Sequence, residues 1–365
     1  MSGGSGGLRP RSPGTGVPPT LEQVAALAGV SRATVSRVVN GSPKVSPAVR
    51  AQVERAVAKL GYVPNRAARS LVTRRADSVA LVVSEPHARF FSEPFFAGMV
   101  RGVSAALAGT GVQLVLLIAQ DLPDRGRLER YVAGGHVDGV LLASLHGDDP
   151  LPGTLERAGV PAVLVGRPVG GVRGPAGAVP RSIGGVASAS WVDADNRGGA
   201  AKAVDHLARQ GRRRIATITG PLDMGVGLDR LEGYRDGLAA AGLAGAGDLV
   251  ETGDFTEEGG AAAMVRLLER PGSPVDAVFA ASDLMAAGAL RALQTAAHRV
   301  PEDVAVVGFE DSAVARYAQP PLTTVRQPIE EMGRQATRLL LARVAGESGG
   351  MHLILDTELV LRASA

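Results

Sequence analysis

The chain contains no cysteine, which excludes disulfide bonds and thiolate metal sites and fits a reducing compartment. Aromatic residues make up only 3% of the 365 residues, and no uncharged apolar run is long enough to cross a bilayer. Residues 1–19 are mostly Gly, Ser, Pro and Arg, without the apolar run of a signal peptide or a membrane anchor. We therefore expect a globular cytoplasmic protein that begins with a disordered tail over residues 1–19.

Signatures of catalysis are also missing. The sequence has no HExxH pair, no Walker A sequence, no G-x-G-x-x-G after a strand and no G-x-S-x-G elbow. The six histidines are scattered, at His87, His136, His146, His206, His298 and His352. We therefore expect no catalytic residue, no metal site and no cofactor.

Acidic residues are almost absent from the first fifth of the chain. Residues 1–75 contain twelve Lys or Arg and only two acids, Glu22 and Glu54, which gives a net charge of +10. The whole chain carries +3, so the remaining 290 residues carry about −7. A basic head on a mildly acidic body is typical of a module that docks on a polyanion.

This basic head predicts a helix-turn-helix unit of three short helices. N-caps are expected at Thr20 (a capping box with Gln23), Ser31 and Ser46, and the first two helices are expected to end at Gly29 and at Asn40-Gly41. The residues predicted to face inward are Leu21, Val24, Ala25 and Ala28, then Val35, Val38 and Val39, then Val49, Val53, Ala56 and Leu60.

The outer face of the second helix has the chemistry of a DNA-reading surface. Arg32, Ala33, Ser36 and Arg37 face out near its N-terminal half, the part of a recognition helix that meets base edges. Arg37 is suited to bidentate pairing with guanine. Short polar and cationic groups suited to phosphate contacts are Thr34, Ser36, Asn40 and Lys44. The alternative is a small three-helix domain with an ordinary solvated face.

The motif Val30-Ser-x-x-Thr-Val-Ser-Arg-Val-Val-Asn40, followed by Gly61-Tyr-Val-Pro-Asn65 and Ala68-Arg-Ser-Leu71, resembles the LacI family of transcriptional regulators. The resemblance covers nearly the whole chain from Thr20. It implies a hinge helix over residues 65–71, with Leu71 as an apolar wedge in the minor groove. Such a short helix needs a partner to be ordered. The residues expected to bind DNA are Thr20, Ser31, Arg32, Ala33, Thr34, Ser36, Arg37, Asn40, Lys44, Asn65, Ala68 and Leu71.

After Arg75 the pattern changes to alternating strands and helices, which indicates parallel α/β units. Apolar runs that predict buried parallel strands are 78–83, 112–118, 139–143, 162–165, 215–219, 277–280 and 304–309, and helices are predicted over 127–132, 198–209, 231–241, 257–268 and 284–293. About 290 residues is long for one sheet, so two lobes with a cleft are expected. The closing run 351–359 is expected to come back to the cleft and to form a strand or a crossover near it.

The fold class is therefore α/β, a two-lobed periplasmic-binding-protein-like core of parallel sheets with a small all-α helix-turn-helix N-terminal domain. The expected divisions are the tail (1–19), the helix-turn-helix domain (20–63), the hinge helix and linker (64–76) and the two-lobed effector-binding and dimerisation domain (77–365). Residues 168–190, rich in Gly, Pro and Ala, are expected to form a flexible surface loop near the first crossover between lobes.

Ligands of open α/β sheets bind beyond the carboxyl ends of the strands. By the resemblance, the effector-binding residues are Phe95 and Phe96 (an aromatic stacking pair), Arg167, Arg230, Ser282 and Glu310. Ser282 and Glu310 stand where the family commonly has Asn and Asp, and Gly166 replaces a frequent acidic residue. A sugar is the expected effector. The alternatives are core packing for the phenylalanines, helix N-caps for Asp195 and Asp283, and a structural ion pair for Arg230.

The sequence thus predicts a ligand-responsive repressor that binds a palindromic operator as a homodimer. No leucine heptad follows Leu359, so a tetramerising coiled coil is not expected there. Two other classes stay open. One is a solute-binding protein of a transport system, disfavoured by the missing export signal, and the other is an α/β enzyme with a DNA-binding head.

Overall fold

The computed structural model describes residues 19–39, 41–63, 75–147, 149–169, 189–243, 249–272 and 274–365. The chain divides into two compact units between Ala76 and Asp77. Residues 1–18 of the predicted tail, residues 64–74 of the predicted hinge segment, and residues 170–188 of the predicted loop lie outside the described residues.

The first unit contains the three predicted helices, α1 (Leu21–Ala28), α2 (Arg32–Val39) and α3 (Pro47–Leu60). The capping box is confirmed, because Thr20 Oγ1 accepts from the Gln23 N–H and the Gln23 side chain accepts from the Thr20 N–H. Ser31 Oγ likewise accepts from the Thr34 N–H, and Ser46 caps α3 ahead of Pro47. The inward faces also agree with the prediction, with Val24, Val35 and Val53 fully buried.

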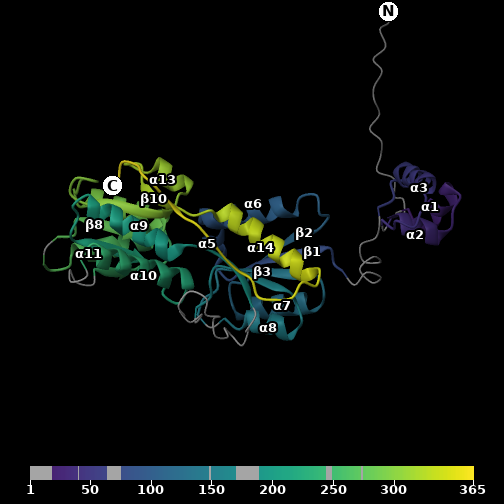
Figure 1. Ribbon diagram of the computed structural model, residues 1–365, viewed down its shortest axis with the longest axis horizontal. Coiled ribbons are helices and arrows are strands. Elements are labelled where there is room, and N and C mark those ends of the chain that lie inside the picture. Colours follow the sequence, from purple (N-terminus) through teal and green to yellow (C-terminus); the bar gives the residue numbers. More distant parts are fainter. Residues whose placement is uncertain are drawn as a thin grey trace, which may run out of the picture. The chain divides into compact units, whose positions relative to one another are not determined.

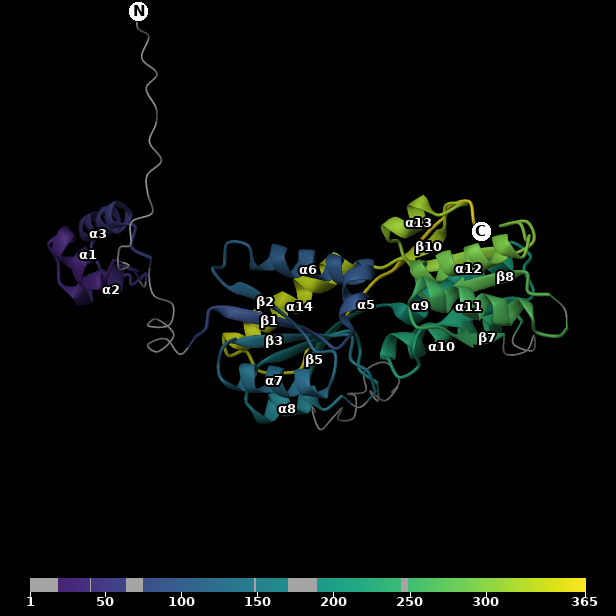
Figure 2. The same cartoon turned by 180° about the vertical axis from the view of Figure 1, so that it is seen from behind.

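The second unit has two lobes, each built on a six-stranded sheet (Figures 1 and 2). Lobe 1 has the strand order β11-β5-β4-β3-β1-β2. Its strands are β1 (Ser78–Val83), β2 (Gln113–Ile118), β3 (Gly139–Ala143), β4 (Ala162–Val165), β5 (Ser190–Ala194) and β11 (His352–Leu355), and its helices are α5 (His87–Ser92), α6 (Pro94–Leu107), α7 (Leu122–Ala133), α8 (Leu151–Arg157) and α14 (Ile329–Val344). All of its strand pairs are parallel.

Lobe 2 repeats this arrangement, with the strand order β12-β10-β9-β8-β6-β7. Its strands are β6 (Ile215–Thr219), β7 (Val250–Thr252), β8 (Ala277–Ala280), β9 (Ala305–Glu310), β10 (Thr323–Arg326) and β12 (Glu358–Val360), and its helices are α9 (Asn196–Arg209), α10 (Gly225–Ala240), α11 (Glu257–Leu268), α12 (Asp283–Thr295) and α13 (Ala313–Tyr317). Among the described strand pairs of this lobe, β12 runs antiparallel to β10, and the other pairs are parallel.

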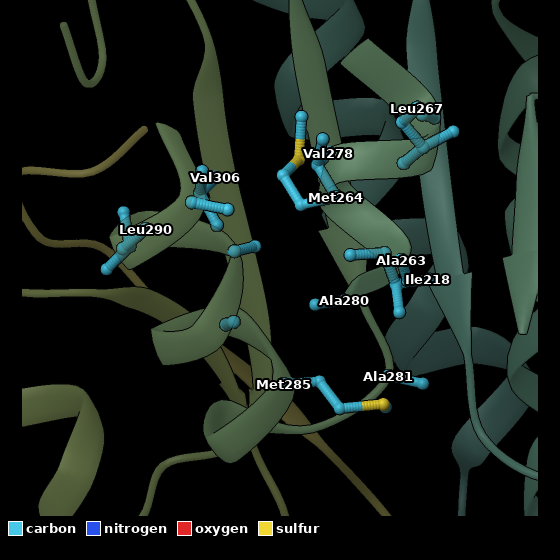
Figure 3. Close-up of a cluster of buried hydrophobic side chains, with 14 of the residues drawn as sticks. Ile218, Ala263, Met264, Leu267, Val278, Ala280, Ala281, Met285, Leu290 and Val306 are labelled. Carbon is cyan, nitrogen blue, oxygen red and sulfur yellow. The ribbon is translucent and has the colours of Figure 1, made fainter. Parts of the chain in front are cut away.

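Each sheet is covered on both faces, because alternate residues of its strands point to opposite sides. In lobe 1, Val79, Leu81 and Val83 pack with residues of α6 and α14, whereas Ala80 and Val82 pack with residues of α7 and α8. Figure 1 shows these two pairs of helices on opposite sides of the sheet. In lobe 2, one core lies under α11 and α12 and the other under α9 and α10. Figure 3 shows the first of these, where Met264 and Met285 fill the space between α11, α12 and the sheet.

The chain passes between the lobes three times, after β5, after β10 and between β11 and β12. The first passage, at residues 194–196, therefore follows the Gly- and Pro-rich segment 168–190 rather than coinciding with it, and that segment joins two strands of lobe 1. The predicted return of the closing run is confirmed, since β11 joins lobe 1 and β12 joins lobe 2.

One strand prediction needs correction. The apolar run 112–118 was expected to be a buried strand, but β2 lies at the edge of its sheet and Leu116 is 39% exposed. An edge strand has a neighbour on one side only, so its residues lack the cover that the central strands receive.

Close packing of α6 on α14 gives the first testable prediction. A Cβ atom at Gly102 would collide with the carbonyl oxygen of Glu330 at the start of α14. We expect Gly102→Ala to lower the free energy of unfolding by about 1–3 kcal/mol, the usual effect of overpacking. Gly126→Ala on α7 is the matched control, since its Cβ would meet nothing closer than 3.6 Å. Urea denaturation of both variants checks this, and equal stabilities would contradict it.

Candidate functional site

A cavity of about 690 Å³, including its solvent-open part, lies between the two lobes of the second unit. It forms where the carboxyl ends of strands from both sheets approach each other, the usual ligand position in this strand order. Its lining includes the apolar residues Phe95, Met224, Val226, Phe255 and Met332 and the polar residues Arg89, Glu93, Ser144, Arg167, Asp193, Arg230, Glu310 and Gln327.

Unusual backbone conformations accompany this lining. Ser144, Phe255 and Glu310 have φ values of 59°, 67° and 111°, a region that non-glycine residues rarely adopt. Ser144 directly follows β3 and Glu310 is the last residue of β9, so each lies at the carboxyl end of a strand. Backbone strain of this kind costs about 1–3 kcal/mol per residue and is concentrated at functional sites.

Arg230 of α10 is the cationic centre of the cavity. Its side chain is buried and donates to Asn196 Oδ1 (2.9 Å), to Gln327 Oε1 (3.0 Å) and to the carbonyl oxygen of Ala281. The guanidinium also lies 3.7 Å from the centre of the Phe309 ring. These three hydrogen bonds use three of its five N–H donors, and the acceptors are neutral, so the contacts described here do not make Arg230 a member of a structural ion pair.

Carboxylates lie near this arginine, and none of the ion pairs found among the described residues includes it. Burial raises the pKa of Asp193 to about 6, and it raises the pKa of Glu310 well above the ordinary value, with Glu93 and Asp283 adding repulsion. Burial also lowers the pKa of Arg230 to about 10, which leaves it charged at neutral pH. The cavity therefore contains a fixed cation beside buried carboxyl groups, a combination that suits ligands with many hydroxyl groups.

Arg167 connects the lobes at the wall of this cavity. It follows β4 of lobe 1, and its guanidinium makes a bidentate ion pair with Asp229 of α10 in lobe 2. Its backbone N–H donates to Asp193 Oδ2 at 2.9 Å. A bidentate pair of this kind fixes orientation as well as charge, so Arg167 holds the two walls together.

The first unit presents the second candidate site, the outer face of α2. Arg32, Ala33 and Arg37 are exposed there, while Val35 and Val38 on the same helix are buried in the core of the head. Arg32 is ion-paired with Glu22 at 2.9 Å, and both side chains are largely exposed. Exposed pairs are worth at most about 1 kcal/mol, so this arginine is readily available to a polyanion.

Two family models match the chain. The model for bacterial regulatory proteins of the lacI family matches residues 20–65, and the periplasmic binding protein-like domain matches residues 204–365. The chain is 56% identical to the HTH-type transcriptional regulator CelR of Thermobifida fusca over 347 residues, which cover 95% of this chain and 98% of the relative. The chain belongs to the lacI family of bacterial regulatory proteins.

Solved structures of this family agree with the fold. A transcriptional regulator CelR–cellobiose complex has a TM-score of 0.73 and 53% identity, covering 95% of this chain and 100% of that one. A lac repressor dimer bound to operator and an anti-inducer has a TM-score of 0.78 and 26% identity, with coverage of 95% and 99%. This lacI-family chain is a DNA-binding transcriptional regulator and not an enzyme. It is therefore neither the solute-binding protein nor the α/β enzyme that the sequence left open as alternatives. Within the described ranges, none of its helices is both long and apolar enough to traverse a membrane.

The structure brings four of the six predicted effector residues to the cavity wall: Phe95, Arg167, Arg230 and Glu310. Phe96 does not line it. Its ring is 1% exposed and packs against Phe90 in the lobe 1 core, with ring centres 5.1 Å apart, so its predicted stacking role is wrong. Consecutive helical residues point about 100° apart, so Phe95 and Phe96 cannot share one face.

Ser282 is also corrected. Its hydroxyl caps α12 by accepting from the Met285 N–H at 3.2 Å, and it is not among the lining residues. The predicted N-cap at Asp195 is confirmed, whereas Asp283 is the first residue of α12 and not its cap. Asp283 instead accepts from Thr324 Oγ1 and from the Ser312 N–H, and its pKa is raised to about 7 by burial.

Several lining residues were missed by the sequence reasoning. Asp193 is the second-last residue of β5 and Gln327 directly follows β10, so their positions at strand ends were a usable signal. Phe255 follows the three-residue strand β7, which is too short to be recognised by periodicity. Of the predicted DNA contacts, Asn40, Asn65, Ala68 and Leu71 lie outside the described residues.

Proposed function

We propose that this chain is a repressor that binds a palindromic operator as a homodimer in the cytoplasm, and that a glucose disaccharide such as cellobiose controls it. The single observation that carries the ligand assignment is the cavity, which combines apolar and charged walls in one space between the lobes.

The lining matches the surface of a sugar. A pyranose ring has C–H faces that stack on Phe95 and Phe255, and equatorial hydroxyls that accept from Arg230 and donate to carboxylates such as Glu310. The CelR structure that is 53% identical to this chain contains cellobiose, which supports the same class of ligand here. We assign effector contacts to Phe95, Phe255, Arg230, Glu310 and Gln327.

Support for the DNA partner and for the dimer comes from the head and from the lac repressor dimer on its operator. Two copies would place two α2 helices about one DNA turn apart on a palindrome. The segment 65–71 would then fold against its counterpart, with Leu71 in the minor groove. Effector binding would shift the lobes so that the two hinge segments no longer meet, which releases the DNA.

The test selects bound duplexes from a random pool and then measures binding of the selected site. We expect a palindromic consensus, and we expect cellobiose to weaken binding about 5- to 150-fold, the usual range of allosteric coupling. Maltose and ribose serve as control sugars. If cellobiose instead tightened binding to the selected DNA, the effector would promote repression rather than relieve it. If cellobiose left DNA binding unchanged, the assignment of this ligand class would be rejected.

A further inference from the structure

A chain of polar contacts crosses from lobe 1 to lobe 2 beside the cavity. In lobe 1, Glu85 follows β1, Arg89 lies on α5 and His146 follows β3. In lobe 2, Asp223 precedes α10 and Phe255 follows β7. Three members of this network therefore lie in lobe 1, and the network reaches lobe 2 at two points, Asp223 and Phe255.

His146 has an acceptor on each side of its ring. Its Nδ1 is 3.0 Å from Asp223 Oδ2 of lobe 2, and its Nε2 is 3.0 Å from Glu85 Oε1 of lobe 1. Carboxylates only accept hydrogen bonds, and a neutral imidazole has one N–H. Both contacts are therefore hydrogen bonds only when the ring is protonated. The Gly147 N–H adds a second link to lobe 2, through the carbonyl oxygen of Asp223 at 2.7 Å.

The remaining members hold Glu85 in place. This carboxylate is 3% exposed and accepts from Ser144 Oγ at 2.5 Å and from Arg89 Nη1 at 2.9 Å, both through the oxygen that faces His146. Arg89 also pairs with Glu93 at 3.0 Å, and its guanidinium lies 5.2 Å from the centre of the Phe255 ring. Glu85 cannot move away from the histidine without giving up these contacts.

We propose that Glu85, His146 and Asp223 form a proton-dependent latch between the lobes, so that the effector domain closes more readily at acidic pH. Its effect on effector affinity rests on the proposed function, whereas its effect on lobe closure does not. Closure and effector binding are coupled, because the cavity is bounded by both lobes.

The sign of the pH dependence follows from the histidine. Its hydrogen bond to Glu85 is the largest influence on its pKa, and together with Asp223 it raises that pKa above the ordinary value of about 6.5 against the opposing effect of burial. Arg89, which shares Glu85, and Glu93 are the other charged groups in the network. The closed arrangement therefore binds the proton more tightly than the open one. The latch is complete below pH 6.5 and is lost as the pH rises through the raised pKa.

The first experiment measures cellobiose affinity of the full chain at pH 6 and pH 8 by titration calorimetry. We expect the wild type to bind about fivefold more tightly at pH 6, at the lower end of allosteric coupling. His146→Gln donates one hydrogen bond and carries no charge, so it should lose the pH dependence that the latch adds and keep only the part that cavity carboxyl groups such as Asp193 contribute. Asp223→Asn should reduce it, because the amide removes one of the two negative charges. His206→Gln on α9 is the matched control and should behave as the wild type.

The second experiment needs no ligand and separates the two proposals. Because the chain has no cysteine, Ala133→Cys on α7 and Ala262→Cys on α11 allow spin labels to be placed on exposed positions of the two lobes. Labelled chains diluted into unlabelled protein should show a larger fraction of short distances at pH 6 than at pH 8. The same double-cysteine pair with His146→Gln should show no change.

The outcomes are distinct. If cellobiose does not bind at either pH but the distances shift with pH, the ligand proposal fails and the latch stands. If the distances do not respond to pH in the wild type, the latch is wrong, even if cellobiose binds. A pH dependence that His146→Gln retains in full also overturns the latch, because another group must then carry the proton.

Discussion

Replacing Arg230 by methionine should abolish cellobiose binding and lower the free energy of unfolding by several kcal/mol, because each buried acceptor left without its donor costs about 1–3 kcal/mol. The side chain is 2% exposed, and its removal leaves Asn196 Oδ1, Gln327 Oε1 and the Ala281 carbonyl without their donor. Methionine approximates the length of the arginine stem, so the loss reports on the guanidinium rather than on volume.

The loss of stability caused by Arg230→Met should also depend on pH. The positive charge of Arg230 lowers the pKa values of Asp193 and Glu310, although burial still raises both. Without it, these carboxyls hold their protons more strongly in the folded state than in the unfolded chain. Protonation of each carboxyl then stabilises the folded state at low pH. This contribution to stability is lost as the pH rises through the pKa of that carboxyl in the folded state. We expect a larger destabilisation at pH 8 than at pH 5.5.

Chemical denaturation at the two pH values checks this prediction, with Arg266→Met as the matched control. Arg266 is exposed on α11 and pairs with Glu251, so its loss should cost less than about 1 kcal/mol. If Arg230→Met were as stable as the control variant and bound cellobiose, Arg230 would be neither the centre of the cavity nor a ligand contact.

The central strands could be read from the sequence because their burial is nearly complete. Strands β1, β3 and β8 are buried on both faces, so each appears as a mostly apolar run. Strand β10 was missed because it begins with two threonines. Thr323 and Thr324 are nevertheless fully buried, since their hydroxyls bond to groups from distant segments, such as Arg362 and Asp283.

The sequence predicted the position of the cavity better than it predicted the side chains that line it. The rule that ligands bind beyond the carboxyl ends of strands led to Arg167 and Glu310. It could not distinguish Phe95 from Phe96, because which helical face meets the sheet depends on how α6 packs against α14. It also did not reveal the contact between Arg89 and Phe255, which lie on different lobes and are 5.2 Å apart only in the folded domain.

Replacing Arg37 by alanine should remove the base preference at one position of each half-site and cost about 1–3 kcal/mol of discrimination there. Arg37 lies in the last turn of α2 and not in the N-terminal half where it was predicted. Its side chain is exposed, while the neighbouring Val38 is buried and fixes the orientation of the helix. The substitution removes no buried contact of the head, so its fold should be unchanged. Selection from a random pool would show the altered position as a degenerate base pair.

Lys44→Ala provides the contrast that makes the Arg37 result interpretable. A phosphate contact carries no sequence information, so this variant should bind all duplexes more weakly and lower the salt slope by about one ion. Arg55→Ala, an exposed change on α3 with the same loss of charge, controls for net charge alone. If Arg37→Ala kept the consensus and instead lowered affinity uniformly, as expected for Lys44→Ala, then Arg37 would be a backbone contact. The sequence preference would then have to come from Arg32 and Ala33, the other exposed residues at the start of α2.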